Sequence, residues 1–166
     1  RPITRAYETE VTVTDKGVSL KTTLSMTPIL LQRIFTVEIL WEIDGKGAVT
    51  ADIQAQKDER YIQLPRFGLR LFLPKTMEQV QYFGMGPIES YRDKRRASWH
   101  GLFSATALQL HEDYLRPQEN GSHFDCQYVS LSDGENALQV TAQAPFSFNA
   151  STYTQEELTD KAHSYE

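Results

Sequence analysis

The chain of 166 residues is long enough for one domain with a buried core, since a chain of this size buries roughly 70% of its unfolded surface. Its 17 Lys and Arg against 22 Asp and Glu give a net charge of -5, and no basic cluster is dense enough to follow a phosphate backbone, which argues against nucleic acid as a partner. No apolar stretch approaches the ~20 residues that span a bilayer, which argues against a membrane partner.

Two features concern the origin of the chain. Cys126 is the only cysteine, so no internal disulfide can form, and this usage suits a reducing cytoplasm. The chain begins at Arg1, without an initiator methionine or an apolar leader, and we therefore expect a piece of a longer polypeptide.

Alternation of apolar and polar residues predicts strands along most of the chain. Residues 7–14 and 18–26 alternate on either side of a turn at 15–17, with Ser25 among the outward residues, and this pattern predicts a hairpin. Residues 35–43 and 49–55 flank a glycine-rich turn and predict a second hairpin. Further strands are predicted at 67–73, 77–83, 124–131, 137–142 and 146–149.

Two segments depart from this alternation. Residues 84–110 are irregular and charged, and are interpreted as a long, partly ordered excursion between strands. Thr154 and Glu157 have the spacing of a capping box, which predicts a short helix over 155–162. About nine strands imply an all-β fold of two packed antiparallel sheets. Because no repeat or linker is visible, residues 1–166 are predicted to form a single domain without an internal boundary.

Side chains that could carry chemistry are sparse. Loop carboxylates such as Glu89 and Glu112 are typical of turn caps and local ion pairs, so none is assigned as a catalytic acid. His111-Glu112-Asp113 lacks the i, i+4 spacing of a metal site on a helix, so no metal site is predicted. Cys126 is interpreted as a core thiol, because Phe124 and Tyr128 are expected on the same strand face.

The polar run from Arg116 to Gly121 has two interpretations. The structural one is a strand that ends in a turn, in which Pro117 cannot donate to a ladder and Arg116 pairs with Glu119. The functional one is a hydrogen-bonding rim for a hydroxyl-rich ligand, with Trp99 or Tyr91 as a stacking face. Residue types alone favour the structural interpretation without excluding the other.

Three runs, in this order, resemble the small-chain domain that ends the large β-galactosidases of glycoside hydrolase family 2. They are LPRFGLRL at 64–71, VQYFGMGPIESYRD at 80–93 and YLRPQENG at 114–121, and the residues from 146 to 158 extend the likeness. Two positions differ from the residues that are common in this family: Arg92 stands where proline is common, and Ser90 where asparagine is common.

The resemblance implies an antiparallel two-sheet supersandwich similar to galactose mutarotase, with one short C-terminal helix. It also implies a parent enzyme that hydrolyses terminal β-D-galactosides such as lactose with retention, using glutamates and magnesium in a separate catalytic barrel. None of those ligands maps onto this chain, so we expect an isolated segment that is inactive and holds no cofactor. Its expected partners are the galactoside in the parent active site and the other domains or large subunit of an oligomeric, cytoplasmic enzyme.

Under the resemblance, this segment forms a wall of the substrate pocket and has no catalytic residue of its own. The candidates for ordering that rim are Glu89, Tyr91, Arg116, Glu119 and Asn120. Two alternatives stay open. One is a free-standing carbohydrate-binding module with Trp41, Trp99, Tyr82 or Tyr91 as stacking faces. The other is an aldose mutarotase, which needs an acid and a base about the sugar ring.

Overall fold

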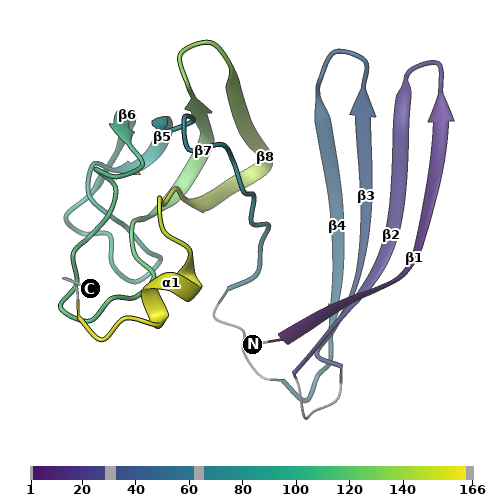
Figure 1. Ribbon diagram of the computed structural model, residues 1–166, viewed down its shortest axis with the longest axis horizontal. Helices are drawn as coiled ribbons and strands as arrows, with labels where there is room; N and C mark the ends of the chain where they lie inside the picture. The colour runs from purple at the N-terminus through teal and green to yellow at the C-terminus, as the bar shows by residue number, and fades with distance from the viewer. Residues whose placement is uncertain (1, 29–32, 62–65, 164–166) are drawn as a thin grey trace. The chain divides into compact units, whose positions relative to one another are not determined.

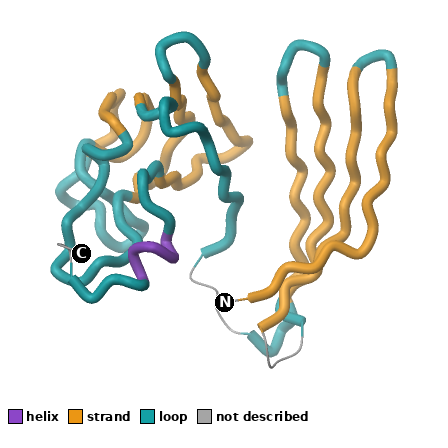
Figure 2. The backbone as a smooth tube through the Cα atoms, in the orientation of Figure 1, coloured by secondary structure: helices purple, strands orange, loops and turns teal. Residues whose placement is uncertain are grey.

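A computed structural model describes residues 2–28, 33–61 and 66–163 (Figure 1, Figure 2). Within these ranges the backbone forms eight β-strands and one short helix. Contacts divide the chain into two compact units, Arg1–Leu69 and Arg70–Glu166, and each holds a four-stranded antiparallel sheet. The all-β class with two antiparallel sheets and a short C-terminal helix is therefore confirmed. Face-to-face packing of the sheets, likeness to a mutarotase and a single undivided domain stay predictions.

The N-terminal unit is a meander in which every strand pairs with its neighbour in sequence. Its strands are β1 (Pro2–Thr14), β2 (Gly17–Pro28), β3 (Phe35–Asp44) and β4 (Val49–Lys57), in the order β1-β2-β3-β4. The two predicted hairpins are thus confirmed, and the purple-to-blue ribbons of Figure 1 follow them.

Strand register brings the apolar residues of this sheet into line. Phe35, Val37 and Ile39 of β3 form its buried cluster, with Leu24, Met26 and Ile53 packed against it from the neighbouring strands. Toward the hairpin ends, aligned residues such as Val13 and Val49 are 75% and 57% exposed. The core of this unit therefore lies at the end of the sheet where β3 begins and β4 ends.

A bulge lies near the start of β1. Ala6 pairs with Leu24 and Glu8 with Thr23, which leaves Tyr7 as an extra residue between them. The Tyr7 hydroxyl accepts hydrogen bonds from Ser25 Oγ at 3.3 Å and from Arg33 Nη2 at 3.1 Å. The outward placement predicted for Ser25 is wrong, since its exposure is 3%, and the bulge explains it by bringing a long side chain over Ser25.

The C-terminal unit has a crossed strand order. Its strands are β5 (Gln79–Gly86), β6 (Trp99–Thr106), β7 (Ser122–Ser132) and β8 (Ala137–Asn149), arranged β6-β5-β7-β8. The buried core contains Tyr82, Val80, Cys126 and Val129. Because β5 pairs with both β6 and β7, the loops that leave its end at Gly86 and that enter β7 at Ser122 meet at one edge of the sheet.

Three sequence predictions for the residues from 67 onward are wrong. Residues 67–73 form no strand, because their alternating pattern finds no partner ladder, and Phe67, Leu71 and Phe72 are left exposed. Strand β6 lies inside the segment interpreted as an irregular excursion. The two strands predicted at 137–142 and 146–149 are one continuous strand, β8.

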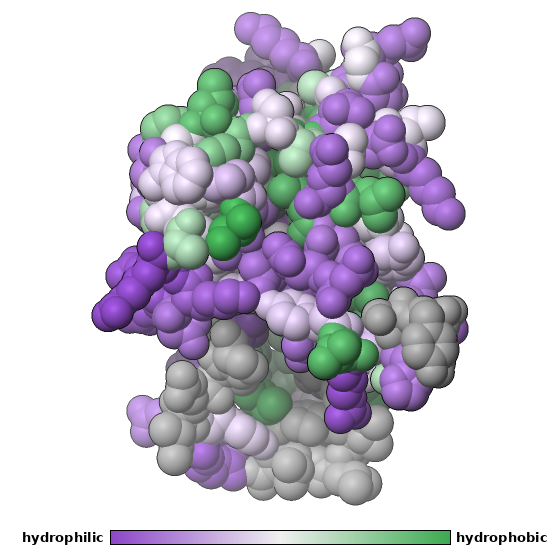
Figure 3. All heavy atoms as spheres, turned by 90° about the vertical axis from the view of Figure 1, so that its left-hand side faces the viewer, coloured by the Kyte–Doolittle hydropathy of each residue, from purple (hydrophilic) through white to green (hydrophobic). Residues whose placement is uncertain are grey.

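The helix α1 (Gln155–Thr159) is shorter than predicted but starts where expected. Thr154 Oγ1 accepts a hydrogen bond from the Glu157 N–H at 3.1 Å, and the Thr154 N–H donates to Glu157 Oε2 at 2.7 Å, so the capping box is confirmed. Within the described ranges no helix is long and apolar enough to cross a membrane. The face shown in Figure 3 is mainly hydrophilic, with apolar side chains in small groups.

Candidate functional site

Glu89 is a highly connected polar side chain among the described residues of the C-terminal unit. It lies in the loop after β5, is 4% exposed, and accepts hydrogen bonds from four donors. The donors are Lys94 Nζ and the Tyr114 hydroxyl on Oε1, and the Gly121 N–H at 2.9 Å and the Tyr91 hydroxyl at 3.4 Å on Oε2. One carboxylate therefore ties together the chain segments around 89–94, 114 and 121.

Electrostatics keep this carboxylate charged. Burial raises the pKa of Glu89, but the hydrogen bonds from Lys94, Tyr114 and Gly121 outweigh burial, so the pKa lies below its ordinary value. Glu89 in turn raises the pKa of Lys94. Burial first, then the charges of Glu89 and Glu119, raise the pKa of Tyr91 to about 12, so its phenol stays protonated and able to donate.

Ser90 closes the same loop onto the start of β7. It is fully buried, its hydroxyl donates to the Met85 carbonyl at 3.1 Å, and it accepts from the Phe124 N–H at 2.9 Å. The Ser90 N–H donates to the Ser122 carbonyl at 2.7 Å. Ser90, which stands where asparagine is common in the family that the sequence resembles, therefore makes three hydrogen bonds.

Asn120 organises the second loop from within. It is 6% exposed, its Oδ1 accepts from the Glu112 N–H at 2.9 Å, and its Nδ2 donates to the Gln118 carbonyl at 3.0 Å. Gly121 follows at φ +70°, and a Cβ there would lie 2.3 Å from the Leu110 carbonyl oxygen. The left-handed conformation at this turn is adopted by the glycine, because only a hydrogen fits that space.

The five predicted rim residues have different surroundings in the structure. Glu89, Tyr91 and Asn120 belong to the connected loops, and the charge of Glu119 acts on Tyr91. Arg116 is exposed and, within the described ranges, forms no hydrogen bond or ion pair, so the pairing with Glu119 considered above is not formed. None of the five has been tested as a rim residue, and that role stays a prediction.

Sequence reasoning missed three members of this network. Lys94, Tyr114 and Ser90 were assigned no role from the sequence, yet all three bond to Glu89 or to its loop. The available signal was that Ser90, Glu89 and Tyr114 lie within the runs that carry the family resemblance.

A cavity of about 250 Å³ adjoins the network. Its wall combines the loop that carries Tyr114 with the C-terminal helix segment; it is lined by His111, Glu112, Asp113, Tyr114, Pro117, Asn120, Tyr153, Glu157, Leu158, Lys161 and His163. Tyr114 therefore belongs to both features, since its hydroxyl bonds to Glu89 while the residue lines the cavity.

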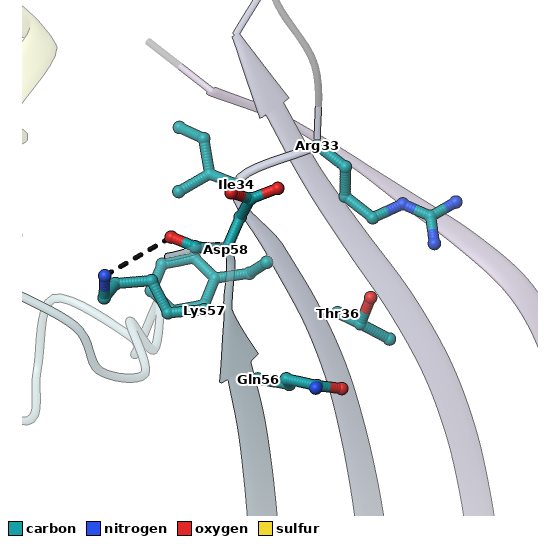
Figure 4. A pocket seen from close by; sticks show the side chains of 7 residues that line it. Arg33, Ile34, Thr36, Gln56, Lys57 and Asp58 are labelled. Carbon is teal, nitrogen blue, oxygen red and sulfur yellow. Dashed lines mark hydrogen bonds between the residues drawn. The ribbon is translucent and has the colours of Figure 1, made fainter. Parts of the chain in front are cut away.

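A second cavity, of about 210 Å³, lies in the N-terminal unit between the start of β3 and the end of β4 (Figure 4). Its charged groups have partners within the chain. Lys57 Nζ donates to the carbonyls of Asp58 and Tyr61, Asp58 pairs with Arg60 at 2.6 Å, and Arg33 donates to Tyr7. These contacts are typical of a structural turn.

Other residues singled out from sequence have mainly structural surroundings. Cys126 is fully buried in the core, which confirms the core-thiol interpretation. Tyr82 is also fully buried and cannot be a stacking face, whereas Trp99 is 59% exposed. In the described ranges no group of three His, Cys, Asp or Glu side chains could hold a metal ion.

Comparison with known proteins gives consistent matches. The family model described as β-galactosidase small chain matches residues 3–166. A β-galactosidase of Actinobacillus pleuropneumoniae is 44% identical over 98% of this chain, and one of Staphylococcus xylosus is 34% identical over 96%. The chain spans 16% of the length of each of these relatives. The matches and the all-β fold together place this chain in the β-galactosidase small chain family.

Proposed function

We propose that this chain is the C-terminal scaffold domain of a family 2 β-galactosidase, whose parent enzyme hydrolyses terminal β-D-galactosides such as lactose with retention. In that reaction one carboxyl protonates the leaving oxygen while a second forms a covalent galactosyl intermediate that water releases. Both carboxyls would lie in a catalytic barrel elsewhere in the parent. The family match over residues 3–166 carries this proposal.

Within the parent, the proposed task of this domain is to order loops on one side of the substrate pocket. The Glu89 network supports this task, because one buried carboxylate fixes two loops that meet at the same sheet edge. Rigid loops restrict water access and hold neighbouring groups in place, which are the usual contributions of a supporting wall. Arg116 is exposed at the second loop, so its side chain is available for contact with another part of the enzyme.

The magnesium implied for the parent would be held by other residues. Within the described ranges this chain offers no fitting group of ligands, so no part of the reaction is assigned to a metal here. A cytoplasmic location is part of the same proposal and is supported by Cys126, a free thiol in the core. The parent is proposed to be oligomeric, with its other domains or a large subunit as partners of this one.

The test uses the full-length parent enzyme with Arg116→Ala and Glu89→Gln, and Glu135→Gln as a control at an exposed carboxylate of the C-terminal unit. We expect each of the first two variants to lower kcat/KM for lactose by about tenfold, and the control to leave it unchanged. Unchanged kinetics and unchanged stability in both variants would refute the rim assignment. Galactoside hydrolysis by the purified 166-residue chain alone would refute the scaffold assignment.

The two alternatives have separate tests. For a mutarotase, polarimetric equilibration of freshly dissolved α-galactose should be faster with the chain than in buffer. For a free-standing carbohydrate-binding module, sugar binding should occur in a protein that has no catalytic domain.

A further inference from the structure

We propose that the cavity lined by Tyr114, Tyr153 and the 111–113 segment, named here the His111–Tyr153 cavity, binds a single neutral sugar residue. This site goes beyond the scaffold role proposed above, and it can exist whether or not the Glu89 loops touch the parent active site. Its size of about 250 Å³ lies below the usual range of pockets for drug-sized ligands, which suits one sugar ring better than an oligosaccharide.

Aromatic side chains supply the stacking surface. Tyr153 is 45% exposed, and its ring meets the His111 imidazole edge-on, with 5.1 Å between centroids. Tyr114 is held at two points, since its hydroxyl donates to Glu89 and its ring lies 5.6 Å from Lys94 Nζ. Rigid tyrosines bind the C–H face of a sugar at low entropic cost, because their rotamers are already restricted.

Polar groups around these rings match sugar hydroxyls. Glu112, Asp113 and Glu157 line the cavity. The Glu157 carboxylate already accepts from Thr154, so Glu112 and Asp113 supply the acceptors, and Asp113 lies 3.5 Å from His111 Nε2 while remaining 89% exposed. The other ring nitrogen, His111 Nδ1, is buried without a hydrogen-bond partner among the described residues. Ionised carboxylates only accept hydrogen bonds, so their natural ligands here are groups that donate, such as hydroxyls.

Charge selects among the possible ligands. Three carboxylates line the cavity and Lys161 is its one lysine, so an anionic ligand such as a phosphate or a sugar acid would meet net repulsion. A neutral polyhydroxylated ring therefore fits the His111–Tyr153 cavity best.

The test is titration of the 166-residue chain with D-galactose, followed by saturation-transfer NMR and by isothermal calorimetry. We expect a dissociation constant on the order of 1–10 mM, weakened at least about tenfold by Tyr153→Ala and little changed by Tyr153→Phe, which keeps the ring. Tyr128→Ala removes a tyrosine of β7 that lies outside the cavity lining, and should leave binding unchanged. Near-native circular dichroism of Tyr153→Ala, with galactose binding restored in Tyr153→Phe, establishes that the loss reflects the ring.

D-Galacturonate is the matched ligand, since it has the same ring with a carboxylate added. It should bind about tenfold more weakly than galactose or not at all. The proposal is overturned by absence of galactose binding up to ~100 mM, by equal binding in folded Tyr153→Ala, or by equal affinity for galacturonate. Failure of the Arg116 and Glu89 kinetic test would leave these binding results standing, so the two proposals can fail separately.

Discussion

The N–H of Gly121 lies 2.9 Å from Oε2 of Glu89, which joins the start of β7 to the loop that leaves β5. Both residues are fixed for independent reasons. Glu89 is held by Lys94 and Tyr114, and Gly121 by a left-handed backbone beside the Leu110 carbonyl. The contact therefore depends on four segments of the chain, around residues 89–94, 110, 114 and 121. Substitutions at this contact should change both the stability of the unit and the order of its loops.

Glu89→Ala should lower the free energy of unfolding by about 2 kcal/mol, because the Gly121 N–H loses its acceptor in a buried position and Lys94 loses its partner. Lys94 is largely exposed, which keeps the ion-pair share small. Urea unfolding of the 166-residue chain measures the change. Glu135→Ala, at an exposed loop position, should change it by less than ~0.5 kcal/mol. Equal effects of the two substitutions would contradict the network.

Gly121→Ala should be more damaging than Gly134→Ala. Both glycines have positive φ, +70° and +93°, so each substitution carries a backbone penalty of about 1–2 kcal/mol. At Gly121 the new Cβ would also meet the Leu110 oxygen at 2.3 Å, whereas nothing lies within 4 Å at Gly134. The difference in unfolding midpoint between the two variants isolates that steric contact, and identical midpoints would show that the loop relaxes freely.

Stability should fall as the pH drops below about 6.5, and His123 should account for part of the fall. Burial lowers the pKa of His123 below its ordinary value of 6.5, only partly offset by the Met85 carbonyl and Glu89. The unfolded chain then binds a proton that the folded chain excludes, so stability rises with pH up to about 6.5 and is lost below it.

Replacement His123→Phe should flatten this dependence, measured as urea midpoints at pH 7, 6 and 5. Gln139→Ala, at an exposed position of β8, should retain the wild-type slope. A slope that survives His123→Phe unchanged would assign the effect to other groups. The contribution of Glu89 occupies a lower window, because its lowered pKa gives stability above about 4.5 that is lost as the pH falls.

Cys126 should resist thiol reagents in the folded chain. Its side chain is fully buried, and burial, followed by the charge of Asp125, raises the pKa of the thiol to about 12, so little thiolate exists at pH 8. Ellman's reagent should therefore react slowly with native protein and release one equivalent once guanidinium unfolds it. Rapid reaction under native conditions would contradict the packing of Gly84 against the Cys126 sulfur.

Sequence reasoning succeeded where local pattern and structure have the same cause. The hairpins of β1–β2 and β3–β4 follow from period-two alternation around short turns, and the start of α1 follows from the Thr154–Glu157 capping box. It failed at 67–73, where the residues alternate but have no partner strand to pair with. It also failed at β6, because the charged residues before this strand of eight residues led us to interpret the whole segment as irregular.

In the candidate site, too, some residues could be predicted from the sequence and others could not. Glu89 and Asn120 were identified through the family resemblance, because they lie in the runs at 80–93 and 114–121 that carry it. Lys94 was missed because a basic run gives no sign of which lysine reaches a buried carboxylate five positions away. Ser25 illustrates the limit for faces, since it is buried beside Tyr7, the bulge residue of the neighbouring strand, and nothing in the sequence marks that bulge.

Tyr114 has its hydroxyl on Glu89 and lines the His111–Tyr153 cavity, so the two features share one rigid group. A ligand that prefers the Tyr114 orientation held by an ionised Glu89 must make the Glu89 carboxyl harder to protonate. By thermodynamic reciprocity, protonation of Glu89 must then lower the affinity for the ligand by the same factor. Sugar affinity and acid titration of Glu89 would then be two readings of a single coupling free energy.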